Sequence, residues 1–191
     1  MDLRKKILSL RDKLPVWQAA KYSQKITQNL RRLEEYKSCH LPLFFYSFRS
    51  EVDTTVEIER RVKTHKHVAL PKTNIPYKKL ECFLITSLGQ LKPGAFSILE
   101  PDPSLCQKVH SKQIDLVIVP GSVFDRRGAR FGYGGGFYDR FLSNDAPQAT
   151  RIGLAFSFQV LDNDIPIKPH DQFMDYIITE NEIISCNERT R

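Results

Sequence analysis

The segment from Arg130 to Asp139, RFGYGGGFYD, is the part of the sequence best suited to chemistry because it is dense in glycine. Its glycines are Gly132, Gly134, Gly135 and Gly136. Glycine tolerates positive φ and lets backbone N–H groups approach a phosphate closely. A helix that begins near Phe137 would add the partial positive charge of its N-terminus. The segment therefore predicts a phosphate-binding loop, and the alternative interpretation is a flexible surface turn.

Charged side chains near this loop could bind a phosphate or a metal ion. Arg126, Arg127 and Arg130 carry guanidinium groups, which bind phosphate oxygens in pairs, although the first two could also be solvated surface charge. Asp139 lies in the first turn of the expected helix, where a carboxylate could hold Mg²⁺ against phosphates or simply stabilise the helix dipole. The glycines do not directly follow the apolar run at 115–119, so the loop is neither a Walker loop nor a Rossmann fingerprint.

Helical patterns occur both before the loop and directly after it. Apolar residues recur every three or four positions over residues 2–36, which indicates two helices that meet near Pro15. A further amphipathic helix is expected at 51–63, and another begins near Phe137. These helices must cover whatever sheet the apolar runs between them form.

Short apolar runs alternate with the helical segments. They predict strands at 41–46, 67–70, 80–85, 115–119, 152–156 and 176–178. We expect Pro71 to end the second strand, 80–85 to be the candidate for an antiparallel strand, and 88–103 to be irregular. Because parallel strands need crossovers that occupy both faces, the pattern predicts an α/β fold with a mostly parallel sheet.

Length and composition indicate one globular domain, residues 1–191. The 41% hydrophobic and 27% charged content does not favour a disordered or fibrous chain. No apolar run approaches the roughly 18 residues that span a bilayer and the N-terminus lacks a secretory core, so we expect a soluble cytoplasmic protein. The four cysteines lack metal-ligand spacing, which argues against a zinc site and a disulfide framework. A net charge of +7 suits an anionic partner, whether nucleic acid, nucleotide or metabolite.

The glycine-rich segment resembles the signature of one family. The matching positions are Pro120-Gly121, Phe124-Asp125, Gly128, Arg130, Gly132, Gly134, Gly136 and Tyr138-Asp139. On these residues, 115–142 is similar to the 5-formyltetrahydrofolate cyclo-ligase family, also called methenyltetrahydrofolate synthetase. Weaker matches extend the resemblance over nearly the full chain: Arg4 and Arg11, Glu51-Val52, Leu70-Pro71, Ile165-Pro166, Asp171 and Thr179-Glu180.

The resemblance implies an enzyme with a three-layer α/β/α sandwich fold and ATP and Mg²⁺ as cofactors. It implies closure of 5-formyltetrahydrofolate to 5,10-methenyltetrahydrofolate with release of ADP and phosphate. A formamide oxygen is a poor leaving group and the formyl carbon is a weak electrophile, so phosphorylation of that oxygen would address both. The resulting imidate phosphate would be attacked by the neighbouring folate amine, and the protein would mainly position groups and offset negative charge.

The resemblance also assigns roles to individual residues. It places around ATP the residues Arg4, Arg130, Phe131, Gly132, Tyr133, Gly134, Gly135, Gly136, Phe137 and Tyr138, with Arg130 and Tyr133 as catalytic residues. It places around the folate Tyr46, Glu51, Tyr133, Gly134, Gly135, Gly136 and Phe137, where Glu51 accepts hydrogen bonds from the pterin. Asp139 and Asp171 would be the Mg²⁺ ligands. Phe45 and Phe96 are further candidates for the pterin wall. For Phe45, Phe96 and Tyr46 an ordinary core role stays open, as does a turn-capping role for Asp171.

Two departures from the family pattern concern charge. Many members carry lysine where this chain has Gly135, so we expect Arg130, supported by Arg126, to supply the phosphate counter-charge. Members often carry another lysine four residues before the position of Arg4, which here would precede Met1; Lys5 or Lys6 could substitute.

Three other functions stay open. A sugar-phosphate isomerase or transferase could use the same scaffold and loop, and a folate-binding member could have lost turnover. Nucleic-acid binding would rest on the pI of 9.3 and on basic patches at 4–6, 31–32 and 126–127, but no recognised module accompanies them. We expect 5-formyltetrahydrofolate, with or without a polyglutamate tail, as the partner, no nucleic acid or membrane, and a monomer or weak homodimer.

Overall fold

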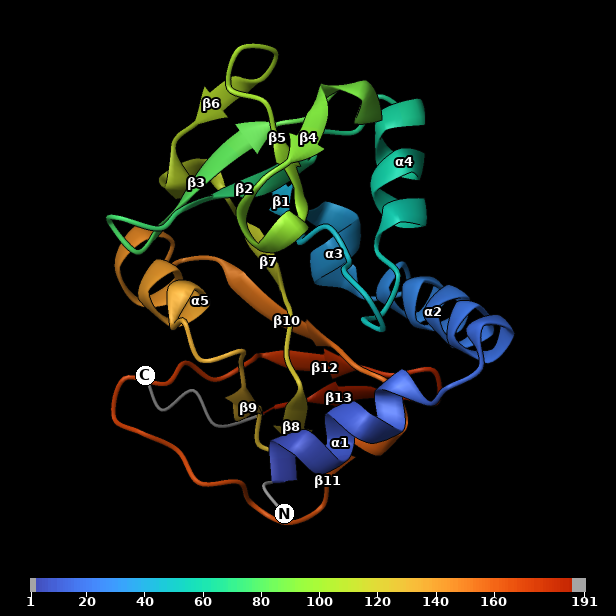
Figure 1. The fold of residues 1–191 in the computed structure, drawn as a ribbon. Coiled ribbons are helices and arrows are strands. Elements are labelled where there is room, and N and C mark those ends of the chain that lie inside the picture. The colour runs from blue at the N-terminus through green and yellow to red at the C-terminus, as the bar shows by residue number, and fades with distance from the viewer. Residues whose placement is uncertain (1–2, 187–191) are drawn as a thin grey trace.

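An eight-stranded sheet forms the centre of the computed structural model, which describes residues 3–186 (Figure 1). Its order is β13-β12-β10-β7-β1-β2-β3-β6, and the strands are β1 (Pro42–Leu43), β2 (Ala69–Asn74), β3 (Lys79–Leu84), β6 (Gln107–Val109), β7 (Leu116–Val119), β10 (Thr150–Leu154), β12 (Tyr176–Ile178) and β13 (Ile183–Ser185). The five strands from β12 to β2 are parallel, whereas β13, β3 and β6 pair antiparallel at the two edges. The expectation of a mostly parallel sheet is confirmed.

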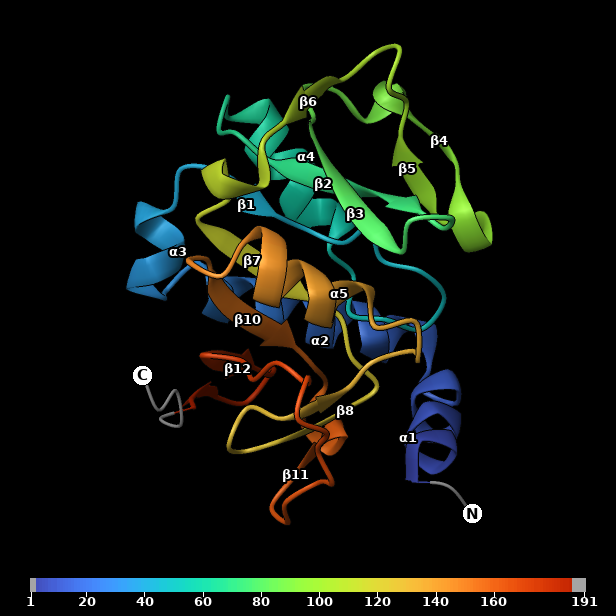
Figure 2. The same cartoon turned by 90° about the vertical axis from the view of Figure 1, so that its left-hand side faces the viewer.

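Helices cover both faces of this sheet. They are α2 (Val16–Leu30), α3 (Glu34–Ser38) and α4 (Thr55–Lys63) on one face, and α5 (Phe137–Arg140) continued by the π-helix η4 (Phe141–Asp145) on the other (Figures 1 and 2). The alternation of β7 explains the two layers, because Leu116 and Ile118 pack with the first group of helices, while Val117 and Val119 pack with Phe141 of η4. The sandwich arrangement expected from the resemblance is therefore present.

The N-terminal helix α1 (Leu3–Asp12) packs away from the large sheet, against a smaller one. Ile7 of α1 belongs to one hydrophobic cluster with Val123 and Ala129 of the hairpin that β8 (Val123–Asp125) and β9 (Arg130–Phe131) form. The predicted break near Pro15 is present between α1 and α2, but the range 2–36 holds the start of a third helix, α3, where two were expected; Asp2, its first residue, lies outside the described residues.

The remaining elements are short. They are β4 (Leu91–Pro93), β5 (Leu99–Pro101), β11 (Val160–Leu161), and the 3₁₀ helices η1 (Leu88–Gln90), η2 (Ala95–Ser97), η3 (Ser111–Gln113) and η5 (Ser157–Gln159). β11 pairs with β8, and β4 pairs with β5. The expectation that 88–103 is irregular was thus partly wrong, and the stretch between β7 and α5 contains a hairpin rather than a continuous loop.

The prediction that Pro71 ends a strand was also wrong. Pro71 lies inside β2 and pairs with Cys82 of β3. The carbonyl oxygen of Ala69 accepts a hydrogen bond from the amide of Phe44, so Ala69 and Pro71 both direct their backbone polar groups toward β1. Because β1 ends at Leu43, the missing N–H of Pro71 removes no hydrogen bond from the sheet.

Two further boundaries differ from the prediction. Only Pro42–Leu43 of the apolar run at 41–46 pairs as a strand, and the helix expected at 51–63 begins at Thr55. Side-chain hydrogen bonds keep the intervening residues in a loop, since Thr54 Oγ1 accepts from the amide of Ser47 and Asp53 Oδ1 accepts from the amide of Thr55. Glu51 lies in this loop, residues 47–54, and not in a helix. Its side chain can therefore contact the glycine-rich loop.

Candidate active site

The glycine-rich loop lies between β9 and α5 and has the backbone that only glycine adopts easily. Gly134 has φ +93° and Gly136, which directly precedes α5, has φ +62°. A Cβ placed on Gly134 would contact only Arg4 Nη1, at 3.9 Å, so open space lies beside this residue. The loop therefore offers backbone N–H groups on an open side, as an anion-binding loop requires.

Arg130 is held beneath this loop by an ion pair. Its Nη2 lies 2.8 Å from Oδ1 of Asp139, and the residue is only 7% exposed. Burial lowers the pKa of Arg130, and the charge of Asp139 opposes that effect. Within the described part of the chain the buried Nε has no hydrogen-bond partner, so an anionic ligand could supply a partner that the protein lacks.

The two carboxylates assigned to Mg²⁺ flank Arg130. Oδ1 of Asp139 accepts a hydrogen bond from the amide of Gln172 at 3.2 Å, which brings the two segments together, and the charge of Asp171 also acts on Arg130. Asp171 Oδ2 accepts from the amide of Lys168 at 2.7 Å, so its turn-capping role is real. Within residues 3–186 no group of three or more His, Cys, Asp or Glu side chains is arranged to hold a metal. Mg²⁺ commonly takes only one or two carboxylates together with phosphates and water, and this pair suits that ligand set.

Glu51 meets the glycine-rich loop through Tyr133, although the two residues are 82 positions apart. The phenol of Tyr133 donates to Oε1 of Glu51 at 2.6 Å, and the amide of Phe48 donates to Oε2 at 2.9 Å. Burial raises the pKa of Glu51, while these two hydrogen bonds and the charge of Arg11 oppose the rise. The expected phosphate loop and the expected folate carboxylate therefore lie in direct contact.

Helix α1 supplies two cations to this site. The guanidinium carbon of Arg4 lies 5.6 Å from the ring centre of Phe131, and Arg11 Nη1 donates to the phenol oxygen of Tyr133 at 2.9 Å. Arg11 appeared in the sequence only as part of a motif. Its spacing of seven residues from Arg4, two turns along one helix face, was the available signal. Lys5 and Lys6, the proposed substitutes for the missing lysine, are exposed.

Arg140 is a second cation that the sequence interpretation missed. Its Nη2 donates to the carbonyl oxygen of Gly135 at 2.6 Å, and its Nε donates to that of Lys78 at 3.0 Å. Positive charge therefore lies beside the position where many family members carry lysine. Arg126, which we expected to serve there, instead forms a bidentate pair with Glu182 at 3.1 and 2.9 Å.

The remaining candidate site residues lie in different environments, some in the core and some at the surface. Arg127 pairs with Asp125 at 2.8 Å, away from the glycines. Phe45 is a buried core residue that also lines a narrow cleft beside Glu51, and Tyr46 packs against the same core. Phe96 is 67% exposed with φ 56°, so it is not a core aromatic residue.

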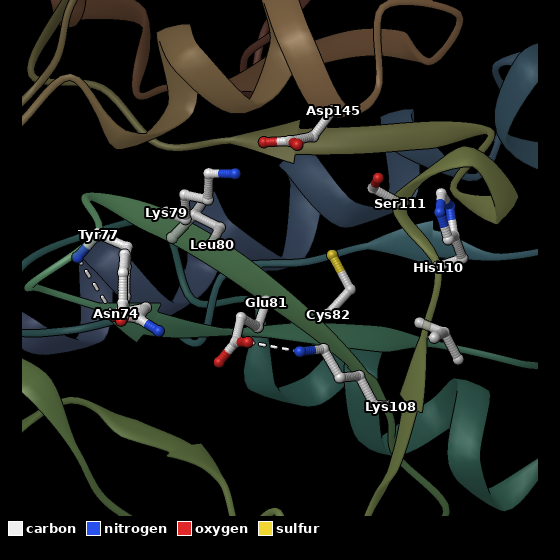
Figure 3. Close-up of a pocket in the computed structure, with 11 residues that line it drawn as sticks. Asn74, Tyr77, Lys79, Leu80, Glu81, Cys82, Lys108, His110, Ser111 and Asp145 are labelled. Atoms are coloured by element: carbon white, nitrogen blue, oxygen red, sulfur yellow. Dashed lines mark hydrogen bonds and ion pairs between the residues drawn. The ribbon is translucent and has the colours of Figure 1, made fainter.

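A cavity larger than this cleft lies elsewhere in the described part of the chain. It has a volume of about 440 Å³ and is lined by residues of β3 and β6 and by Asp145 at the end of η4, with Cys82 and Lys79 directed into it (Figure 3). None of the residues assigned to ATP, folate or Mg²⁺ lines it. Cavity size alone therefore does not locate the candidate site.

Comparison with known proteins decides which family this arrangement represents. The model of the 5-formyltetrahydrofolate cyclo-ligase family matches residues 1–180. The chain belongs to this family. A 5-formyltetrahydrofolate cyclo-ligase from Haemophilus influenzae is 29% identical over 175 residues, which cover 87% of this chain and 93% of the relative. A mitochondrial cyclo-ligase from Arabidopsis thaliana is 30% identical over 177 residues, covering 81% and 64%.

Solved structures of the family share the fold. The NMR structure of 5,10-methenyltetrahydrofolate synthetase from Aquifex aeolicus matches with a TM-score of 0.86 and 30% identity, covering 100% of this chain and 94% of that one. A 5,10-methenyltetrahydrofolate synthetase from Mycoplasma pneumoniae matches with a TM-score of 0.72 and 25% identity, covering 94% and 99%. The cyclo-ligase resemblance is confirmed, and the chain is a ligase of this family.

None of the helices within residues 3–186 is both long and apolar enough to cross a membrane.

Proposed function

We propose that this cyclo-ligase closes 5-formyltetrahydrofolate to 5,10-methenyltetrahydrofolate at the expense of ATP, with Mg²⁺ bound, and releases ADP and phosphate. The observation that carries the proposal is the hydrogen bond between Tyr133 and Glu51. It joins a glycine-rich loop suited to phosphates to a half-buried carboxylate suited to the N–H groups of a pterin. One site can therefore hold both substrates.

The chemistry of the substrate explains why such a junction is needed. The formyl oxygen would take the γ-phosphoryl group as ADP leaves, which gives an imidate phosphate. The neighbouring folate amine would then attack the formyl carbon, and phosphate would leave with the former formyl oxygen. No nucleophilic side chain is required, so the protein contributes orientation and charge stabilisation.

Each assigned residue has a task in this scheme. Backbone N–H groups of the loop at 132–136 and the guanidinium groups of Arg4 and Arg130 would hold the phosphates, and Arg130 would offset the charge that develops during transfer. Glu51 would orient the pterin by accepting its N–H groups. Tyr133 would keep the loop and Glu51 in contact.

The residues present also suit the two groups that the reaction requires. Bound ATP supplies the phosphoryl group, and Mg²⁺ neutralises phosphate charge. Asp139 and Asp171 would hold the metal, and the unpartnered Nε of Arg130 is a donor available to a phosphate oxygen. The remaining counter-charge would come from Arg140, whose guanidinium group already contacts the loop at Gly135.

Folate-dependent release of ADP tests the proposal against its rivals. We expect ADP to form only when 5-formyltetrahydrofolate, ATP and Mg²⁺ are all present. Tight folate binding without ADP release would identify a non-catalytic binding protein. Isomerisation of a sugar phosphate without folate-dependent ADP would identify the isomerase alternative, and either result would overturn the proposal.

The proposed intermediate has its own test. If the formyl oxygen leaves with phosphate, ¹⁸O placed in the formyl group should appear in the released phosphate after one turnover. Phosphate without the label would exclude phosphorylation of that oxygen. Replacing Glu51 by Gln should raise the KM for folate more than the KM for ATP, since only the folate contacts this residue in the scheme.

Several wider properties stay predictions. We propose that residues 1–191 act as one catalytic domain in the cytoplasm, as a monomer or weak homodimer, without nucleic acid or membrane as a partner. One relative is named as mitochondrial, so location is a matter for direct fractionation. Sedimentation with and without random oligonucleotides would test assembly and nucleic-acid binding together.

A further inference from the structure

Arg11 is buried at the end of α1 and contacts two other segments of the chain. It is 5% exposed, and its Nε donates to Ser50 Oγ at 3.1 Å. Its Nη1 donates to the phenol oxygen of Tyr133 at 2.9 Å, and its guanidinium carbon lies 5.9 Å from the centre of the Tyr133 ring. Ser50 in turn donates to Asp12, the last residue of α1. Arg11 thus connects α1, the loop at 47–54 and the glycine-rich loop.

The chemistry of the three groups fixes the direction of the hydrogen bonds. A guanidinium group can only donate, and an ionised carboxylate can only accept. The phenol of Tyr133 must therefore accept from Arg11 and donate its own proton to Glu51 Oε1. This arrangement favours the ionised form of Glu51, because both of its oxygens accept hydrogen bonds: Oε1 from Tyr133 and Oε2 from the amide of Phe48.

We propose that Arg11 is a positioning residue for the folate substrate, which orients Glu51 through Tyr133 and favours its ionised form. The inference rests on the proposed folate-binding role of Glu51. Arg11 acts on the pterin through these two residues, and it therefore governs folate affinity rather than the transfer of phosphate.

The surroundings of Glu51 explain why such support is needed. The charged and titratable groups that face it are Arg11 from α1, Tyr133 from the glycine-rich loop and Tyr138 from α5. Burial raises the pKa of Glu51, and the hydrogen bonds from Tyr133 and Phe48 and the charge of Arg11 oppose it. Among residues 3–186, Arg11 is the one cation in this group of facing residues, so without it the effect of burial on the pKa of Glu51 is less strongly opposed.

Arg11→Gln and Arg11→Lys test the inference, with Lys13→Gln as the matched control. Lys13 is an exposed cation two residues further along the chain. Arg11→Gln should raise the KM for folate about 10–100-fold, as expected for a lost charged hydrogen bond, with a smaller change in the KM for ATP. The acid limb of the folate KM profile should move to higher pH, because Glu51 loses ionisation earlier as pH falls. Arg11→Lys should restore the pH limb, and Lys13→Gln should leave both KM values unchanged.

Equal rises in the KM for folate and for ATP, with an unmoved pH limb, would overturn the inference and indicate a structural role. If Arg11→Gln does not fold, Tyr133→Phe provides the same test, because it keeps the ring under Arg11 but removes the donor to Glu51. The same shift of the pH limb is then expected, and its absence would again overturn the inference.

A ¹³C NMR titration separates this inference from the proposed function. The carboxyl resonance of Glu51, assigned by its loss in Glu51→Gln, should titrate at higher pH in Arg11→Gln than in the wild type. An unchanged titration would refute control by Arg11 even if the enzyme is active. A wild type that forms no methenyl product would refute the proposed function, whatever the titration shows.

Discussion

Replacing Asp139 by Asn tests whether this carboxylate holds a metal or only a buried arginine. The pair is well shielded, since the side chains of Arg130 and Asp139 are 3% and 17% exposed. Removing one partner of a buried pair outright costs about 3–5 kcal/mol. Asparagine keeps an oxygen that can accept from Arg130 and from the amide of Gln172, so only the charged part of the interaction is lost. We therefore expect a loss of about 1–2 kcal/mol.

That loss of stability is too small to explain a large loss of activity. For a chain of this size it lowers Tm by about 2–8 °C. A typical stability of about 5–15 kcal/mol keeps nearly all molecules folded at 25 °C. If Asp139 binds Mg²⁺, kcat should nevertheless fall about 100-fold or more, and the Mg²⁺ concentration for half-maximal activity should rise.

Thermal unfolding and initial rates over a range of Mg²⁺ concentration provide the measurement. Glu57→Gln is the matched control, because Glu57 is a buried carboxylate paired with Arg31 and Arg60 outside the site. It should lose stability and keep kcat. An Asp139→Asn variant that retains kcat and Mg²⁺ response, while losing only stability, would refute the metal role and leave Asp139 as the partner of Arg130.

The other predictions concern backbone strain, acid stability and the metal. Gly128→Ala should lower Tm at least twice as much as Gly134→Ala. The value of φ is positive at both positions (+98° and +93°), but of these two glycines only Gly128 would place a Cβ 2.4 Å from a backbone carbonyl oxygen. Equal losses of Tm would refute this prediction. Burial acts to raise the pKa of Glu57, but hydrogen bonds from Arg60, Tyr36 and Arg31 outweigh it and hold that pKa below its usual range. A depressed pKa stabilises the fold above the pKa of the unfolded chain and loses this effect as pH falls, so Tm should drop more between pH 5 and pH 3 in the wild type than in Glu57→Gln, and parallel curves would contradict this. Chelation of divalent metal by EDTA should abolish turnover while leaving the far-ultraviolet circular dichroism unchanged, and excess Mg²⁺ should restore it; full activity in EDTA would exclude the metal.

The sheet was predictable where local sequence decides the structure. The run Leu116–Val119 is apolar on both faces because helices cover both sides of β7, and this pattern is visible without any tertiary contact. The error at Pro71 arose because a proline in a strand is tolerated when the neighbouring strand has already ended. The end of β1 at Leu43 is a property of the pairing, which local sequence does not report.

The candidate site was predictable in its residues but not in their contacts. Glycine density and the family resemblance singled out Arg130, Tyr133, Glu51 and Asp139; the structure places Arg130 against Asp139 and Tyr133 against Glu51, while their roles stay predictions. The sequence did not indicate that Arg130 is buried against Asp139, since a nine-residue separation across a loop has no fixed geometry. The contacts of Arg11 could not be predicted for the same reason, because its partners come from loops 39 and 122 positions away.

The most direct test of the central claim is the near-ultraviolet absorbance of the methenyl product. Wild-type protein should produce a steady rise in this absorbance when mixed with 5-formyltetrahydrofolate, ATP and Mg²⁺, and none when ATP is omitted. The complete mixture, with folded protein and intact folate, could also show no rise in absorbance. That result would contradict the assignment of the segment 130–139 and of Glu51 to one catalytic site.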